Sequence, residues 1–78
     1  MSPKLPSVSS KKVVATLLKI GFYLHHQEGS HLALRSIKNE SVRVVVPANR
    51  KDLKKGTLKS IINQSGLTAE EFIELLKK

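Results

Sequence analysis

The 78-residue sequence predicts an α+β domain of order α-β-β-β-α-α, with a three-stranded antiparallel sheet covered by helices on one face. Apolar residues recur at helical spacing near both ends of the chain and alternate with polar residues in the middle. Short polar turns separate the alternating stretches, which indicates a meander. We expect a disordered segment over residues 1–7 and one domain over residues 8–78. A domain of this size buries only about 60% of its unfolded surface, so a large substrate cleft is not expected.

The first helix is expected over residues 10–20. Ser9 is a suitable N-cap, because its hydroxyl can accept a hydrogen bond from an amide of the first turn. Val8 then precedes the cap and can pack on Val13 as a hydrophobic staple. Gly21 is expected to end the helix, since glycine readily adopts the left-handed conformation of a C-terminal stop.

Three strands are expected after this helix, over residues 22–27, 31–37 and 42–46. Glu28-Gly29 provides a turn between the first two, and Pro47 ends the third because proline cannot donate to a strand ladder. Strict alternation predicts a set of apolar side chains on the face that the helices cover. This set comprises Leu24, Leu32, Leu34, Val42, Val44 and Val46.

Two further helices are expected in the last third of the chain. Gly56-Thr57 opens a second helical pattern, which Gly66 stops. The sequence from Thr68 to Glu71 has the form of a capping box, and Leu67 can pack on Phe72 as a staple. A final short amphipathic helix follows.

The charge is strongly basic, with 14 Lys and Arg against 6 acidic residues and a net charge of +8. This balance predicts attraction to nucleic acid, an anionic membrane or an acidic protein. Basic residues gather at the start of the second helix, where the helix dipole and the unpaired amides of Gly56, Thr57 and Leu58 also favour an anion. A solvated loop that keeps the chain soluble is the alternative. The expected phosphate-binding residues here are Arg50, Lys51, Lys54, Lys55, Gly56, Thr57 and Lys59.

The sequence favours a cytoplasmic protein without a membrane anchor. It contains no cysteine, which excludes disulfides and thiolate metal sites and suits a reducing compartment. Its apolar runs are far below membrane-spanning length, and the first residues lack the apolar core of a secretory signal.

His31 is the candidate catalytic residue. It follows the Glu28-Gly29 turn at the start of the second strand, and imidazole titrates near neutrality, so it suits proton transfer in phosphodiester cleavage. Alternation places Arg35 and Arg43 on the same face, where guanidinium groups could stabilise a phosphorane without a metal. A histidine at a strand start is more often a plain surface residue. For Arg43, solubility and edge protection remain the better explanation.

A metal site or cofactor is not expected. His25 and His26 are adjacent, so on a regular strand they point to opposite faces and cannot chelate one ion together. His25 would share the face of His31, whereas His26 would pack in the interior or at the sheet edge. The glutamates of the last helix are explained by capping and by the helix dipole, which leaves no paired carboxylates for a two-metal nuclease.

A set of short motifs gives the chain a family resemblance. They are Gly21-Phe22, Gly29-Ser30-His31, Val46-Pro47, Lys55-Gly56-Thr57-Leu58, Ile61-Ile62 and Gly66-Leu67. In this order and spacing the chain resembles the HicA toxins of bacterial and archaeal toxin–antitoxin modules, over residues 8–76. The resemblance implies a double-stranded-RNA-binding-domain-like fold and an mRNA interferase in which the histidine of Gly-Ser-His, here His31, is catalytic. It also implies mRNA as substrate and a HicB-like antitoxin that covers the active site, with no small-molecule substrate.

Two departures from the family pattern concern imidazoles. Many relatives have a further histidine soon after Val-Pro, where this chain has Ala48-Asn49-Arg50. If that histidine acts as general acid or in binding, this chain must use Arg50, Lys51 or water instead. Many relatives also follow the motif histidine with another one, where this chain has Leu32. Because Leu32 faces the core by alternation, this second change is structural.

The leading hypothesis is a metal-independent endoribonuclease toxin of low sequence specificity. His31 would take the proton from a ribose 2′-hydroxyl, and Arg35 with the basic stretch would bind RNA and stabilise the developing charge. The alternative is a non-catalytic RNA-binding module of double-stranded-RNA-binding type, which needs the basic surface but not the imidazole. A third hypothesis makes the open sheet face, with Ala33, Ile37 and Val45, a protein-docking surface.

Overall fold

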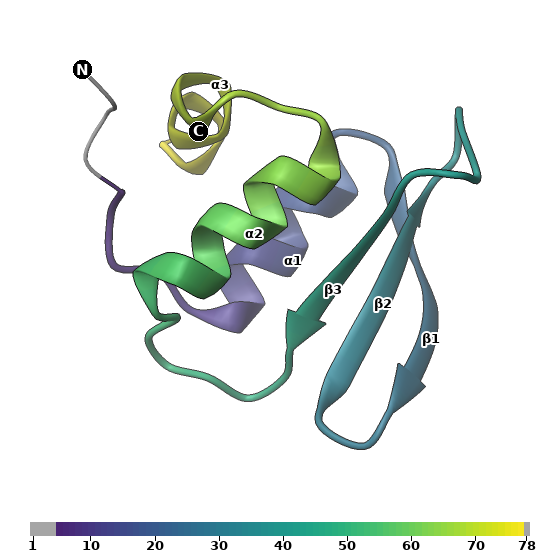
Figure 1. Ribbon diagram of the computed structural model, residues 1–78, viewed down its shortest axis with the longest axis horizontal. Coiled ribbons are helices and arrows are strands. Elements are labelled where there is room, and N and C mark those ends of the chain that lie inside the picture. The colour runs from purple at the N-terminus through teal and green to yellow at the C-terminus, as the bar shows by residue number, and fades with distance from the viewer. Residues whose placement is uncertain (1–4, 78) are drawn as a thin grey trace.

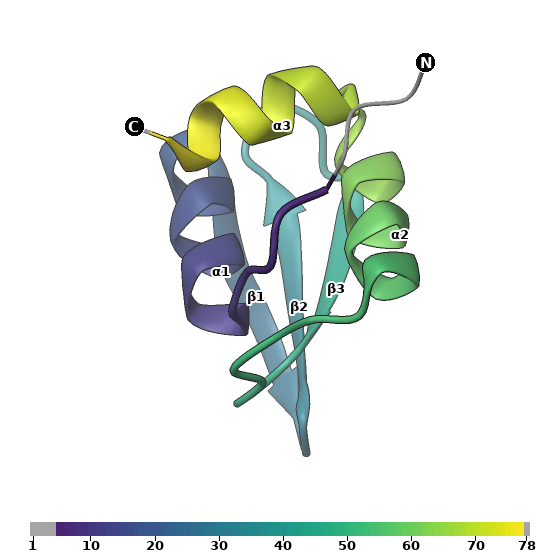
Figure 2. The same ribbon diagram turned by 90° about the vertical axis from the view of Figure 1, so that its left-hand side faces the viewer.

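The computed structural model describes residues 5–77 of the chain (Figure 1). The elements are α1 (Ser10–Lys19), β1 (Phe22–Glu28), β2 (His31–Ser36), β3 (Arg43–Pro47), α2 (Lys55–Ser65) and α3 (Ala69–Leu76). The strands form one antiparallel sheet of order β1-β2-β3. All three helices lie on one side of it, in front of the sheet in Figure 2. The predicted α+β fold and its order of elements are confirmed.

Local sequence signals account for the helix ends. The Ser9 hydroxyl accepts a hydrogen bond from the Lys12 amide at 3.1 Å, and Gly21 follows α1 with a φ of +96°. Thr68 and Glu71 form the predicted capping box at the start of α3. None of the helices within residues 5–77 combines the length and hydrophobicity that crossing a bilayer requires.

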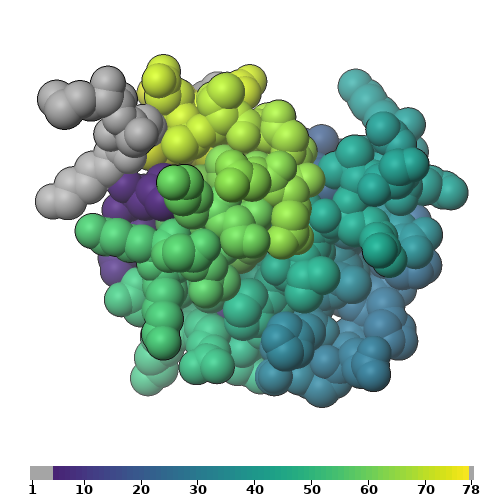
Figure 3. Space-filling view, viewed as in Figure 1, coloured from purple at the N-terminus to yellow at the C-terminus, as the bar shows by residue number. Residues whose placement is uncertain are grey.

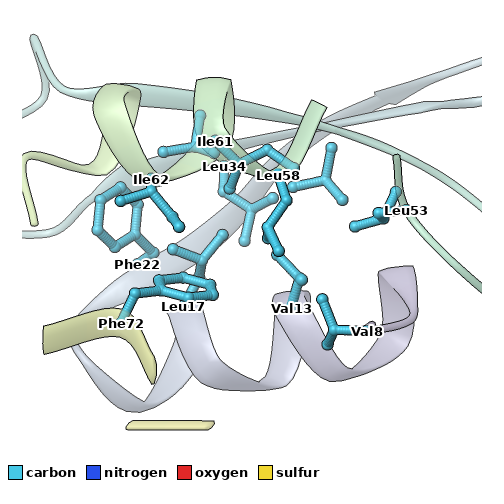
Figure 4. Close-up of a cluster of buried hydrophobic side chains, with 12 residues drawn as sticks. Val8, Val13, Leu17, Phe22, Leu34, Leu53, Leu58, Ile61, Ile62 and Phe72 are labelled. Atoms are coloured by element: carbon cyan, nitrogen blue, oxygen red, sulfur yellow. The ribbon is translucent and has the colours of Figure 1, made fainter. Parts of the chain in front are cut away.

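The core lies between the inner face of the sheet and the three helices (Figure 4). Leu34, Val44 and Val46 are fully buried there, as alternation predicted. Leu32 and Val42 are partly buried and pack against the same cluster. The buried apolar residues of this cluster are Val8, Val13, Leu17, Phe22, Leu34, Val44, Val46, Leu53, Leu58, Ile61, Ile62 and Phe72.

The prediction that Leu24 is buried is wrong, since half of its surface stays exposed. Its partner Leu34 is fully buried, so the register does place Leu24 on the inner side of the sheet. However, β1 is an edge strand, and the residue of β1 that joins the buried core cluster is Phe22, at its start. The apolar cover therefore ends before it reaches the middle of β1.

Helix α2 makes a side-chain hydrogen bond to the edge of the sheet at β3. Along β3, the Val45 amide points outward and donates a hydrogen bond to the Gln64 side-chain oxygen at 2.9 Å. The Gln64 amide nitrogen in turn donates to the Ser60 hydroxyl at 3.1 Å. Helix α2 thus satisfies an edge amide that would otherwise need water.

The segment that precedes α1 runs across the helix layer. Residues 1–4 of the stretch expected to be disordered lie outside the described part of the chain. Residues 5–9 pass between α1 and α2 in Figure 2. Leu5 packs against the core cluster, and the Ser7 hydroxyl donates to the Asp52 carboxylate at 2.6 Å. These contacts tie the segment to the loop before α2.

Candidate nucleic-acid interface

His31 stands at the end of the sheet, on the face that the helices leave open. It begins β2 directly after the two-residue turn Gly29-Ser30, in which Gly29 alone has a positive φ, of +57°. This pattern is that of a type II′ hairpin turn. Across the sheet His31 pairs with Glu28 on β1 and with Pro47 on β3. The side chain is exposed, so a substrate can reach it from solvent.

Arg35 lies on the same face, four residues further along β2. Its cross-strand partners are Tyr23 and Arg43, which confirms that the two arginines and His31 share a face. At about 3.3 Å per residue, Arg35 and His31 are about 13 Å apart along the strand. At this separation Arg35 would hold a phosphate further along the RNA rather than the one on which His31 would act.

A β-bulge in β1 brings a second imidazole to this face. The register shifts between Leu24 and His26, and His26 pairs with Ala33. Since Ala33 and His31 are two residues apart on β2, they share a face, and His26 shares it with them. The prediction that His26 points away from the face of His31 is wrong, because the extra residue breaks strict alternation. The Nε2 atom of His26 lies 3.6 Å from a carboxylate oxygen of Glu28.

His25 is the residue that the bulge leaves without a cross-strand partner. Its ring lies edge-on to that of Tyr23, with centroids 6.2 Å apart. Within residues 5–77, no three histidine, aspartate or glutamate side chains gather as a metal ion would need.

Ser10 holds the basic segment, defined here as residues 48–55, against α1. The buried Ser10 hydroxyl donates to the Pro47 carbonyl at 2.5 Å and accepts from the Arg50 amide at 3.1 Å. The Ser10 amide also donates to the Arg50 carbonyl at 2.9 Å. One residue at the start of α1 thereby determines the path of the chain after β3.

We expect Ser10→Ala to destabilise the fold by about 1–3 kcal/mol, because it leaves two backbone groups without their buried partner. Urea unfolding followed by circular dichroism measures this loss. Ser41→Ala, at an exposed position in the turn before β3, is the matched control and should change stability by less than about 0.5 kcal/mol. Equal effects of the two substitutions would contradict the role given to Ser10.

Arg50 and Lys51 line a groove of about 650 Å³ on the helix side of the β1–β2 hairpin. The opposite wall includes Gln27 and Leu32, the inward-facing residues of that hairpin. His31 lies on the other side of the same hairpin. The structure therefore does not bring Lys51 to the face that carries His31.

Arg50 also borders a smaller crevice, of about 210 Å³, together with Lys54, Thr57 and Pro47. Pro47 is the cross-strand partner of His31, so this crevice adjoins the end of the sheet where His31 stands. Asp52 also lines the crevice, so its two cations and the start of α2 favour a phosphate against one carboxylate.

The start of α2 exposes backbone donors beside these cations. Lys54 is the N-cap, no side chain caps the helix, and its first turn holds no acidic residue. The Leu58 amide is not free as predicted, because it donates to the Lys54 carbonyl at 2.9 Å. By helix geometry the amides without an intrahelical acceptor are those of the N-cap Lys54 and of Lys55, Gly56 and Thr57.

Lys55, Gly56 and Lys59 are exposed on α2. In Figure 3, side chains from the green part of the chain that starts α2 project from the surface. Lys55 also borders a hollow beside Leu5 and Asp52, so these cations spread around the helix start rather than converge on one point.

Residues 10–67 match the family model described as HicA toxin of bacterial toxin-antitoxin. The matched part is more than half of the chain, and it includes the sheet, the basic segment and α2. No curated protein matches the chain.

Proposed function

Because the chain belongs to the HicA toxin family of toxin–antitoxin modules, we propose that it is a cytoplasmic mRNA interferase, an endoribonuclease that blocks translation by cleaving mRNA. The observation that carries this proposal is the exposed His31 at the end of the open sheet face, beside a crevice bordered by Arg50 and Lys54. A base that can take the 2′-hydroxyl proton, together with cationic side chains that hold the phosphate backbone, is what metal-independent cleavage of a phosphodiester requires.

In the proposed reaction His31 takes the proton of a ribose 2′-hydroxyl. The 2′-oxygen forms a bond to the adjacent phosphorus, and the bond from phosphorus to the 5′-oxygen of the next nucleotide breaks. The products are a 2′,3′-cyclic phosphate and a 5′-hydroxyl end. The proton taken from the 2′-oxygen remains on the enzyme, and the leaving 5′-oxygen acquires one.

The basic residues would hold the RNA backbone around this step. Arg50, Lys54 and Thr57 border the crevice next to Pro47, together with Asp52, and would hold a phosphate that flanks the scissile one. Arg35 would bind another phosphate, further along β2. Lys51, Lys55 and Lys59 lie outside that crevice and would contribute to attraction over a longer range, whereas Gly56 would offer its backbone amide to a phosphate at the start of α2.

The nature of the RNA ends tests the reaction class. We expect purified protein, with EDTA present, to cleave a labelled single-stranded RNA to fragments with cyclic or 3′-phosphate ends. Fragments with 3′-hydroxyl and 5′-phosphate ends would instead require water as the nucleophile and would contradict the role of His31. Binding without any cleavage would favour the RNA-binding module.

RNA binding should depend steeply on salt. Each neutralised phosphate of a single strand contributes about −0.7 to the slope of log affinity against log salt concentration. We expect the double substitution Lys54→Gln and Lys55→Gln to make that slope shallower by about 1.4, as measured by fluorescence anisotropy at several salt concentrations. Lys38→Gln, in the loop between β2 and β3, is the control and should leave the slope unchanged. A slope unaffected by the double substitution would exclude these lysines from the interface.

A toxin of this family has an antitoxin partner, and we propose a HicB-like protein that inhibits by covering His31. Two apolar side chains on the open face support this site: Val45 is 44% exposed and Ile37 is 68% exposed. Together with Ala33 they could seat a partner over the face that carries His31. Loss of inhibition without loss of cleavage in a Val45→Asp variant would support this surface.

A further inference from the structure

We propose that His26 is the general acid of the cleavage reaction and donates the proton that the leaving 5′-oxygen requires; this inference rests on the proposed function. General base catalysis by His31 leaves an alkoxide as the leaving group, which departs slowly unless it is protonated. A second imidazole on the open face, near His31, would complete the reaction.

The bulge in β1 puts His26 within reach of the same phosphate. His26 pairs with Ala33, and His31 pairs with Glu28, so the two histidines are diagonal neighbours on adjacent antiparallel strands. Diagonal neighbours have Cβ atoms about 7 Å apart, and the two rings can extend over the space between them. A phosphodiester lying across the hairpin would present its 2′-hydroxyl to one ring and its 5′-oxygen to the other.

The surroundings of His26 suit this role. Its side chain is 60% exposed, and Glu28, two residues along the same strand, lies 3.6 Å from its Nε2 atom. Glu28 is also the direct cross-strand partner of His31, so it neighbours both histidines. The contact with Glu28 engages Nε2 and leaves Nδ1 as the nitrogen that can face the leaving oxygen.

The complete step balances protons and electron pairs. The 2′-hydroxyl proton passes to His31 as the 2′-oxygen bonds to phosphorus. The bond from phosphorus to the 5′-oxygen breaks, its electron pair goes to that oxygen, and the imidazolium of His26 supplies the proton. The products are the 2′,3′-cyclic phosphate and the 5′-hydroxyl, with His31 protonated and His26 neutral.

His25 provides a matched control for this proposal. It neighbours His26 in the chain and is also exposed, but its ring packs edge-on against Tyr23. Tyr23 pairs with Arg35, four residues away from His31 along the sheet. His25 is therefore directed toward the far part of the face, away from the proposed reaction centre.

A substrate with a different leaving group distinguishes a general acid from a residue that acts in binding or positioning. The probes are two short RNAs, one with the natural 5′-oxygen and one with a bridging 5′-sulfur, whose thiolate departs without protonation. We expect His26→Ala to cleave the oxygen substrate at least about 100-fold more slowly than the unmodified chain. The same variant should cleave the sulfur substrate at nearly the unmodified rate. His31→Ala should be slow on both substrates, and His25→Ala normal on both.

Each other result overturns a specific part of the argument. Full activity of His26→Ala on the oxygen substrate would exclude His26 as the acid and leave the proposed function intact. Equal slowing on both substrates would show that His26 acts in binding or positioning. If the unmodified chain cleaves neither substrate, the proposed function itself fails. Circular dichroism of all three variants, which alter exposed side chains, verifies that folding is preserved.

Discussion

Replacing His31 by alanine is expected to abolish RNA cleavage while leaving folding and RNA binding nearly unchanged. A positioned acid or base contributes about 10²- to 10⁴-fold to the rate, so the loss should fall in this range. The side chain is exposed, and its truncation should therefore change stability by less than about 0.5 kcal/mol. The measurement is cleavage of labelled single-stranded RNA with EDTA present, alongside RNA affinity from anisotropy.

The control for this experiment is His25→Ala, which removes an imidazole from the same face without touching the proposed centre. Cleavage lost in His31→Ala and retained in His25→Ala would support a metal-independent ribonuclease centred on His31. Equal cleavage by the unmodified chain and His31→Ala would exclude that role. Binding without cleavage in all three proteins would favour the non-catalytic RNA-binding module.

The largest effect on stability is expected from Phe72→Ala. Phe72 is the fully buried residue of α3, the helix that packs on both α1 and α2. Truncating a buried phenylalanine removes its transfer free energy and leaves a cavity, which together cost about 3–5 kcal/mol. The folded state of a domain is typically favoured by only about 5–15 kcal/mol, so this variant should be largely destabilised at ambient temperature. Urea or thermal unfolding measures the change.

Leu24→Ala is the matched control, because it removes an apolar side chain that is already 50% exposed. Its cost should stay below about 1.5 kcal/mol, the lower end for burying a whole leucine side chain. If Phe72→Ala lost no more stability than the small amount expected for Leu24→Ala, α3 would contribute little to the core.

Much of the fold was predictable because its signals are local. The capping box at Thr68 and Glu71 depends on residues three positions apart. The staple of Val8 on Val13 likewise joins residues five positions apart, on either side of the N-cap. Alternation correctly assigned Leu34, Val44 and Val46 to the core, since β2 and β3 pair regularly. Where strands pair regularly, the period-two alternation of side chains predicts which face of the sheet each residue occupies.

The bulge illustrates what alternation alone misses. The two-residue turn pairs Glu28 with His31, and strict pairing from there would oppose Phe22 to Ile37 on the open face. The observed partner of Phe22 is Ser36, on the core side. A conflict between the register set by a turn and the hydrophobic pattern of a strand indicates one extra residue. The proposed role of His26 depends on this signal.

The position of the basic segment was not predictable for a different reason. Its path is set by Ser10, a residue some forty positions earlier in the chain, through hydrogen bonds to Pro47 and Arg50. No local pattern reports such a long-range contact. Charge clustering therefore indicated a phosphate-binding region, whereas only the structure separates Lys51 on the helix side from the crevice beside Pro47.

The arrangement at the two sheet edges bears on how the molecule behaves at high concentration. Open strand edges template intermolecular β-pairing, which leads to aggregation. On β3, an amide already bonded to Gln64 cannot recruit a foreign strand without first losing that partner. On β1, the bulge interrupts the even spacing of groups that a fibril requires. The irregularity that brings His26 beside His31 thus also helps to keep the folded protein dispersed.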